Sequence, residues 1–441
     1  MSRIYPDYMY GSGPRDGCWW DETLALPPCP ELTVERTVDV AIIGAGFTGL
    51  NAALRLAERG ASVAVLEANQ PGWGASGRNG GFCCLGGGML DSATLRRQYG
   101  VSALQAYRTA EKDAITHVAD LLDRYAIDAD VHSAGETLLA HTPRAAGYLE
   151  QAAETVLTDY DLTATLHRAA NLPALGMDGP FHGALTVPAG FALNPRKYLG
   201  GLLRSAQDHG VAVFGSSPVK GYTKTGGRWK LSTPNGSVEA DVVVVATNGY
   251  SAETLPGWMR SRYLPTQSSV LVTRPISASE QAEAGWTTSQ MAYDTRNLLH
   301  YFRLMPDGRF LFGMRGGLRA TPAAEAASRV AVQRHFQRMF PAWREVEITN
   351  QWSGLVCLSP KSLPFAGPIS EMPGWYAGFA YHGNGVAMGS FVGARLGDHI
   401  MSPDVAKLPA AIASKPGRFP LGRFRRLLMP PVYAAFAWSD R

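Results

Sequence analysis

Apolar and polar positions along the chain predict a βαβ unit at the start of its regular structure. Residues 37–43 (Thr-Val-Asp-Val-Ala-Ile-Ile) are apolar almost throughout, as in a strand covered on both faces of a parallel sheet. Residues 47–59 follow with apolar positions at helical spacing, and residues 62–66 form a second apolar run. The preceding residues 1–36 are rich in Tyr, Trp, Pro and Gly, and we expect an irregular arm there.

The rest of the chain alternates helical patterns with antiparallel ones. Helical spacing is expected over residues 92–126, 144–168, 196–209 and 323–340. Strand patterns cover residues 211–214, an alternating meander at 222–249 that ends in the apolar run 241–246, and a second sheet at 268–274 and 298–314. Residues 374–400 are Gly-rich and then helical.

Composition describes a globular chain and excludes several other classes. Apolar residues make up 46% and charged residues 18% of the 441 residues, which excludes a disordered chain. A net charge of +4 without a dense Lys/Arg run gives no support for a nucleic-acid partner. The five cysteines and ten histidines lack the spacing of a disulfide framework or a metal site. With no signal peptide and no membrane-spanning stretch in the pattern, we expect a cytoplasmic protein.

The turn after the first strand carries a phosphate-binding signature. Gly44-Ala-Gly46-Phe-Thr-Gly49 is G-x-G-x-x-G between a buried strand and a helix, and Glu67 ends the second strand. Gly44 permits the tight turn, Gly46 lets a pyrophosphate reach the helix N-terminus, and Gly49 lets helix and strand pack closely. A dinucleotide site is predicted, and a plain Gly-rich turn is the alternative.

A second glycine-rich segment favours FAD over NAD. Residues 72–81 (Gly-Trp-Gly-Ala-Ser-Gly-Arg-Asn-Gly-Gly) directly follow Glu67, where a Rossmann dehydrogenase normally has a plain connecting helix. The backbone N–H groups of such a loop can surround a second phosphate and a flat ring, as a long cofactor lying across the domain requires. An ordinary flexible loop is the alternative.

These motifs resemble those of the D-amino-acid oxidase-like (DAO) superfamily of FAD-dependent oxidoreductases, and most closely its γ-glutamylputrescine oxidase and pipecolate oxidase group. The similarity rests on both glycine-rich segments, on Ala246-Thr-Asn-Gly-Tyr250, and on the late run Gly378-Phe-Ala-Tyr-His-Gly-Asn-Gly-Val-Ala-Met-Gly389. It implies an α/β protein in which a Rossmann-like FAD-binding domain is interleaved with an α+β substrate domain built on an antiparallel sheet.

We expect the two domains to be discontinuous along the chain. The FAD-binding domain would comprise residues 37–95, 190–260 and 352–400, and the substrate domain residues 96–189 and 261–351. The arm 1–36 and a basic, apolar tail 401–441 would flank them.

The resemblance also implies which residues contact the cofactor, which is expected to be non-covalent FAD. The pyrophosphate would be held by Gly44, Ala45, Gly46, Thr48 and Gly49, and the adenosine ribose by Glu67. The ribityl chain and flavin would be contacted by Ser76, Arg78, Asn79, Gly80 and Gly81. Adenine would contact the backbone of Val219, unless this is only a strand residue. The pyrimidine edge would meet a helix N-terminus at Gly383, Asn384, Gly385, Val386 and Ala387.

Substrate contacts are expected from the second sheet and the late glycine-rich turn. Tyr301 and Arg303 share one strand face, where Tyr301 would cap the substrate and Arg303 would pair with a carboxylate. The alternative makes Arg303 a surface residue, with Arg315 as a second candidate. His382 would line the cavity or else be structural.

Three positions differ from relatives. Sarcosine-oxidase-like members carry a carboxylate-binding Lys where Ala387 stands, so a simple α-amino acid held in that way is not expected. Cys357 lies nearer Pro360 than the cysteine that attaches FAD covalently in those members. Lys361 replaces an acidic residue, and would either favour reaction with oxygen or be solvated.

The sequence therefore predicts an FAD-dependent oxidoreductase acting on the C–N bond of an amine or of an imino or amino acid. By the resemblance, hydride leaves the carbon next to nitrogen for flavin N5, and water hydrolyses the imine. Oxygen is the expected acceptor, giving hydrogen peroxide. One alternative is a membrane-peripheral dehydrogenase that reduces quinone through a membrane-bound tail, although residues 415–438 can also pack on the body. A second is a non-catalytic flavin-binding subunit.

Overall fold

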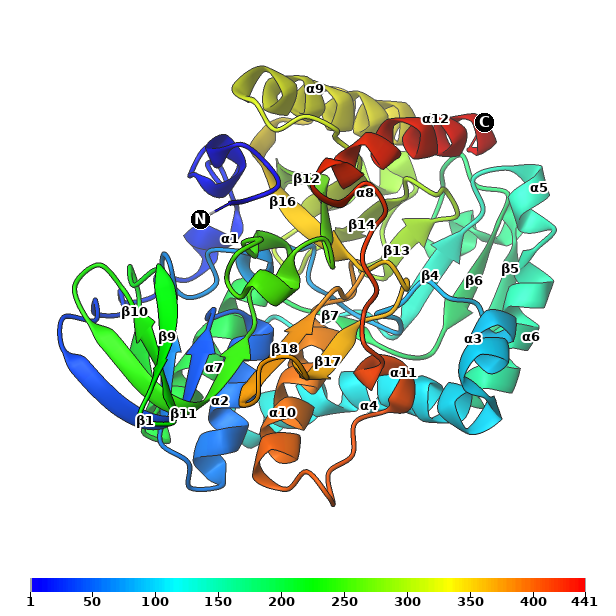
Figure 1. The fold of residues 1–441 in the computed structure, drawn as a ribbon. Helices are drawn as coiled ribbons and strands as arrows, with labels where there is room; N and C mark the ends of the chain where they lie inside the picture. The colour runs from blue at the N-terminus through cyan, green and yellow to red at the C-terminus, as the bar shows by residue number, and fades with distance from the viewer. Residues whose placement is uncertain (1, 441) are drawn as a thin grey trace.

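The computed structural model describes residues 2–440 and is organised around two large sheets (Figure 1). The first sheet has the order β17-β18-β11-β1-β2-β8, and the hairpin β9-β10 extends it from β11. Its strands are β1 (Glu35–Ile43), β2 (Val63–Leu66), β8 (Ala212–Phe214), β9 (Gly221–Thr225), β10 (Arg228–Ser232), β11 (Ser237–Val245), β17 (Phe365–Pro368) and β18 (Trp375–Phe379).

The centre of the first sheet is parallel and buried on both faces. Strand β1 pairs in parallel with β2 on one side and with β11 on the other. Side chains of β1 alternate between two apolar clusters, with Val40 and Ile42 in one and Ala41 and Ile43 in the other. This double burial is why residues 40–43 of β1 are all apolar, whereas the exposed first residues of the strand, 35–37, are polar.

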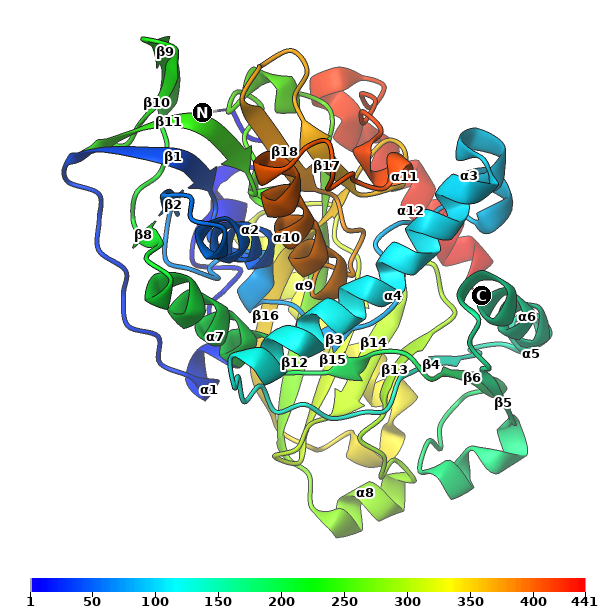
Figure 2. The same cartoon turned by 90° about the horizontal axis from the view of Figure 1, so that it is seen from below.

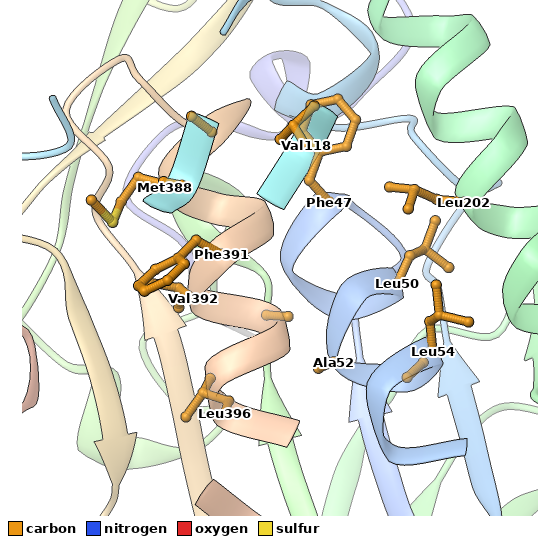
Figure 3. Close-up of a cluster of buried hydrophobic side chains, with 14 of the residues drawn as sticks. Phe47, Leu50, Ala52, Leu54, Val118, Leu202, Met388, Phe391, Val392 and Leu396 are labelled. Carbon is orange, nitrogen blue, oxygen red and sulfur yellow. The ribbon is translucent and has the colours of Figure 1, made fainter. Parts of the chain in front are cut away.

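Helices cover one face of the first sheet (Figure 2). They are α2 (Phe47–Glu58), α4 (Val101–Arg124), α7 (Pro195–Asp208) and α10 (Ala387–Met401). Figure 3 shows Leu50 and Leu54 of α2 turned toward Leu202 of α7, with Val392 and Leu396 on the neighbouring α10. Helices α2 and α10 approach so closely that a Cβ at Gly393 would lie 2.3 Å from the Thr48 carbonyl oxygen. The N-termini of both helices consequently open toward the same region.

The second sheet has the order β16-β12-β15-β14-β13-β4-β6-β5. Its strands are β4 (Glu136–Leu139), β5 (Thr165–Arg168), β6 (Gly183–Val187), β12 (Leu264–Pro275), β13 (Met291–Asp294), β14 (His300–Leu304), β15 (Arg309–Arg315) and β16 (Ile348–Leu358). Helix α9 (Pro322–Met339) covers an aromatic cluster on one face, to which Phe302, Phe310 and Phe336 contribute. Further helices are α3 (Ser92–Tyr99), α5 (Pro143–Ala146), α6 (Leu149–Tyr160) and α8 (Ala278–Ala284).

The predicted fold class is confirmed: an α/β unit is interleaved with a second sheet along one chain. The helix expected over residues 144–168 is partly wrong, because α6 ends at Tyr160, where its C-cap Asp161 is left-handed, and residues 165–168 form β5. Strand β16 pairs with β12, so residues 352–358 join the second sheet although we had assigned them to the first domain. The exact domain boundaries stay a prediction.

Both ends of the chain pack on the body. The arm contains η1 (Asp7–Tyr10) and α1 (Trp20–Thr23), and its Met9 and Trp20 side chains are buried. A short strand β3 (Phe82–Cys83) pairs with β7 (Phe191–Ala192). The tail contains α11 (Ala410–Ala413), η8 (Gly422–Leu428) and α12 (Met429–Ser439), which lies beside α9 in Figure 1.

A buried ion pair fixes the tail. Arg425 is fully buried, pairs with Glu253 at 2.6 Å and donates to the Tyr263 carbonyl oxygen. The sequence left open whether the tail lies on a membrane or packs on the protein body, and in the structure it packs on the body. The side chains of Leu427 and Trp438 in the tail are nevertheless exposed. Within residues 2–440, no helix combines the length and the apolar character needed to cross a membrane.

Candidate active site

A single cavity of ≈ 550 Å³ connects the first sheet to the second. Its walls come from the turn after β1, the loop after β2, the segment after β11 and the turn before α10. Across from these lie side chains of β4, β12, β13, β14 and β15. Segments far apart in the sequence therefore meet around one elongated space.

The first glycine turn lines the cavity with Gly44, Gly46 and Thr48. Gly44 has φ +107° and Gly46 is the N-cap of α2 without a capping side chain of its own. The Phe47 N–H donates instead to Ser76 Oγ at 2.9 Å. The Glu67 carboxylate accepts hydrogen bonds from the N–H groups of Ala45 (2.9 Å) and Asn69 (3.0 Å), and it lines the cavity with Thr48.

The loop after β2 contributes Ser76, Arg78, Asn79 and Gly80 to the cavity wall. The Arg78 guanidinium is buried, lies 4.2 Å from the centre of the Trp73 ring, and donates to the Trp73 carbonyl oxygen at 2.9 Å. Burial lowers the pKa of Arg78, yet its Nη2 has no hydrogen-bond partner among the described residues. An unpartnered buried guanidinium nitrogen beside the cavity fits a ligand that brings acceptors.

The late turn presents a second helix N-terminus to the same cavity. Gly383, Asn384, Gly385 and Val386 line it directly before α10 begins at Ala387. Asn384 Nδ2 donates to the Leu85 carbonyl oxygen, and Thr48 Oγ1 is 2.8 Å from Tyr381 Oη. Two helix N-termini in one cavity favour a ligand with negative charge at two places.

Four residues predicted to contact the cofactor do not line the cavity: Ala45, Gly49, Gly81 and Ala387. Gly49 has a packing role, because a Cβ there would lie 1.9 Å from the Gly44 carbonyl oxygen. Gly81 is equally confined, since its Cβ would lie 2.0 Å from the Leu193 carbonyl oxygen. Val219 does line the cavity, and its contact with adenine stays a prediction.

The substrate side of the cavity is one face of the second sheet. Tyr301 of β14 lines it, and its hydroxyl is 3.0 Å from Ser268 Oγ of β12. The ring packs against the loop after β2, because a Cβ at Gly80 would lie 2.8 Å from it. Tyr293 and Arg315 complete this face.

Arg303 does not line the cavity, so its predicted contact with a substrate carboxylate is not supported. It is 1% exposed and donates to the Leu193 carbonyl oxygen at 2.8 Å, with Nη1 2.9 Å from His132 Nε2. Arg303 shares the face of Tyr301 but lies two residues further along β14, where Gly81 and Trp20 cover the sheet. Burial lowers the pKa of Arg303 to about 9.

Arg315, the second candidate, lines the cavity and donates through Nη2 to the His382 carbonyl oxygen at 2.8 Å. His382 also lines it, but both ring nitrogens have partners. Nδ1 lies 3.0 Å from the Gly87 carbonyl oxygen, and Nε2 lies 3.2 Å from the Ser359 N–H nitrogen that donates to it. Burial lowers the pKa of His382 to about 4, so a neutral, structural histidine accounts for both contacts.

Sequence reasoning missed several cavity residues. Glu136, Cys84 and Tyr293 line the cavity, yet β4 and β13 gave no strand signal from which their position could be inferred. Cys357 lines it too, and burial raises the pKa of its thiol, which disfavours the reactive thiolate. Lys361 is outside the lining and donates to Ser414 Oγ at 3.4 Å.

Comparisons with known proteins agree with this geometry. The family described as FAD dependent oxidoreductase (DAO) matches residues 39–399. The chain is 30% identical to probable oxidoreductase OrdL of Haemophilus influenzae over 85% of each chain. It is 27% identical to gamma-glutamylputrescine oxidoreductase of Escherichia coli, over 93% of this chain and 94% of that protein. Among solved structures, glycine oxidase of Geobacillus kaustophilus superposes with a TM-score of 0.70 at 18% identity, over 87% of this chain and all of that one.

Proposed function

The chain belongs to the family of FAD-dependent oxidoreductases, and from this premise we propose that the enzyme oxidises the C–N bond of an amine or of an imino or amino acid. The observation that carries the proposal is the continuity of the cavity from the glycine turn after β1 to the Tyr301 face of the second sheet. A relative acting on gamma-glutamylputrescine and a fold neighbour acting on glycine support a C–N donor. Because the family consists of enzymes, we do not retain the non-catalytic flavin-binding subunit as an alternative.

The cavity residues fit FAD, and we propose which part of FAD each of them would bind. The two helix N-termini and Arg78 would hold its negatively charged groups, with Glu67 placed for a ribose diol. The redox chemistry belongs to FAD, whose oxidised flavin is the hydride acceptor in this family. The high pKa of the Cys357 thiol supports non-covalent binding, so denaturation with acid should release the yellow chromophore into the supernatant.

On the substrate side we propose two contacts. Tyr301 Oη, held by Ser268 Oγ, offers a hydrogen bond to the reacting nitrogen. Arg315 offers its guanidinium to a carboxylate, and burial both lowers its pKa and strengthens such a pair. No proton transfer is assigned to His382, because its two ring nitrogens are already engaged.

We propose oxygen as the electron acceptor, with hydrogen peroxide as the second product. The tail supports oxygen over a membrane quinone as the acceptor. Its Arg425 and Arg426 side chains bind groups of the protein body and so do not project toward a membrane surface. The exposed Leu427 and Trp438 side chains are the observation that favours the quinone alternative.

Turnover in air tests the acceptor. An oxidase should release peroxide in amounts that match the amine consumed. Rapid amine-dependent reduction of a quinone dye with no peroxide in air would reject oxygen and favour the dehydrogenase. A panel that contains gamma-glutamylputrescine, glycine and cyclic imino acids tests the donor class in the same assay, and failure of every donor to reduce the flavin would reject amine oxidation.

A further inference from the structure

Two carboxyl groups line the cavity: Glu67 accepts hydrogen bonds from the backbone N–H groups of Ala45 and Asn69, whereas Glu136 has, in the described part of the chain, no such backbone donors and no cation beside it. Glu136, at the start of β4, is 5% exposed and lines the cavity. Among residues 2–440 no Lys, Arg or His forms an ion pair with it, and its neighbour on the cavity side is the Cys84 thiol. Burying a carboxylate without a cation is costly, so such a group is seldom kept for stability.

Other buried acids of this chain all have cationic partners. Glu111 pairs with Arg108 at 2.8 Å, Glu253 with Arg425 at 2.6 Å, and Asp294 with Arg296. None of these three acids lines the cavity described above. The unpaired acid is therefore the one that a bound substrate can reach.

Strand register places Glu136 on the same sheet face as the other substrate-side residues. Glu136 is opposite Met291 of β13, and Tyr293 is opposite Tyr301 of β14. Tyr301 is in turn opposite Gly313 of β15, two residues before Arg315. Since side chains two residues apart share a face, Glu136 and Arg315 flank the tyrosines from opposite sides.

We propose that Glu136 is a specificity-determining residue that binds a second, cationic nitrogen of the substrate, distinct from the nitrogen that is oxidised. The inference rests on the proposed amine oxidation and adds the class of substrate: an amine that carries a further ammonium group. An ammonium group of the substrate beside Glu136 would provide the cationic partner that Glu136 lacks in the protein. A methyl group in the same place would leave the carboxyl buried and unpaired.

The physical consequence is discrimination between amines of equal length. Losing a hydrogen bond between charged groups, with one partner left buried, corresponds to a loss of roughly 10- to 100-fold in kcat/KM. Glu136→Gln keeps the size of the side chain and removes its ability to ionise and pair with an ammonium. The preference for a diamine should then shrink toward unity, while the oxidation of a monoamine should change little.

The test uses FAD-loaded enzyme and two pairs of linear amines: putrescine with pentylamine, and cadaverine with hexylamine. In each pair a methyl group replaces the far ammonium. Flavin reduction is followed without air by stopped-flow absorbance, which gives both a dissociation constant and a reduction rate. Glu136→Gln is compared with Glu150→Gln, which removes one exposed acid from α6 and should behave as the unaltered protein.

We expect the unaltered enzyme to prefer each diamine at least tenfold, mainly through the dissociation constant, and Glu136→Gln to lose that preference with its FAD content unchanged. Equal use of both members of a pair by the unaltered enzyme would overturn the inference, even if Glu136→Gln failed to fold. So would an undiminished preference in Glu136→Gln. If no amine in these pairs reduces the flavin but glycine does, the inference fails and amine oxidation stands. If no donor reduces it, amine oxidation itself fails.

Discussion

Replacing Glu136 by Gln should stabilise the protein at alkaline pH and not at acidic pH. Burial raises the pKa of this carboxyl from 4.5 to about 8 in the folded protein. A carboxyl with a raised folded pKa binds more protons when folded than when unfolded between these two values. The stability of the unaltered protein therefore falls as pH rises from about 4.5 to about 8 and levels off above that.

The size of the effect follows from the same two values. Their difference corresponds to at most about 5 kcal/mol, at 1.36 kcal/mol per pH unit. At about 2.1 cal/mol/K per residue, a chain of 441 residues unfolds with an entropy near 0.9 kcal/mol/K. The Glu136→Gln protein should then melt up to about 5 °C higher than the unaltered protein at pH 9.

Differential scanning calorimetry at pH 5 and pH 9 measures this difference. The gain at pH 9 should largely disappear at pH 5, and Glu150→Gln should show no such pH dependence. Equal melting temperatures at pH 9, or a Glu136→Gln protein that melts lower there, would refute the uncompensated burial of this carboxyl.

Four further substitutions have definite expected outcomes. Gly49→Ala places a Cβ 1.9 Å from a backbone oxygen and should reduce the FAD retained on purification at least tenfold, measured as the ratio of absorbance at 450 nm to that at 280 nm. Arg315→Ala should raise KM for carboxylated amines about tenfold or more, while Arg303→Ala should lower the melting temperature and leave KM unchanged, because Arg303 lies outside the cavity. Steady-state kinetics on both variants would contradict this assignment if Arg303→Ala alone raised KM. Arg425→Ala leaves Glu253 buried without its cation and should cost about 3–5 kcal/mol of stability, seen as a lower denaturation midpoint.

The cofactor half of the site was largely accessible from the sequence. Gly44 and Gly46 lie in a local motif whose strand, turn and helix are contiguous, so the pattern itself fixes their geometry. The motif also predicted that Gly49 lets helix and strand pack closely, and the structure shows that close approach. The cofactor contacts that the resemblance implied for Gly49 and Gly81 lie outside the cavity lining. A motif shows which positions require glycine, and the surrounding packing shows whether the reason is a ligand or a nearby backbone segment.

The substrate half was predictable only in part. Tyr301 lines the cavity, and alternation along β14 fixes the sheet face of each residue; its contact with the substrate stays a prediction. Alternation does not tell how far along that face the cavity extends, and Trp20 of the arm covers the sheet at Arg303. Glu136 could not be inferred, because its contact with the cavity depends on pairing between β4 and β13, which are 155 residues apart at Glu136 and Met291.

The most direct test of the account is the spectrum of the purified protein mixed with FAD and then with an amine in the absence of air. The account predicts tight uptake of one yellow flavin per chain and loss of its absorbance at 450 nm when a suitable amine is added. A protein that stays colourless in excess FAD, or whose bound flavin no amine, imino acid or amino acid can bleach, would contradict it.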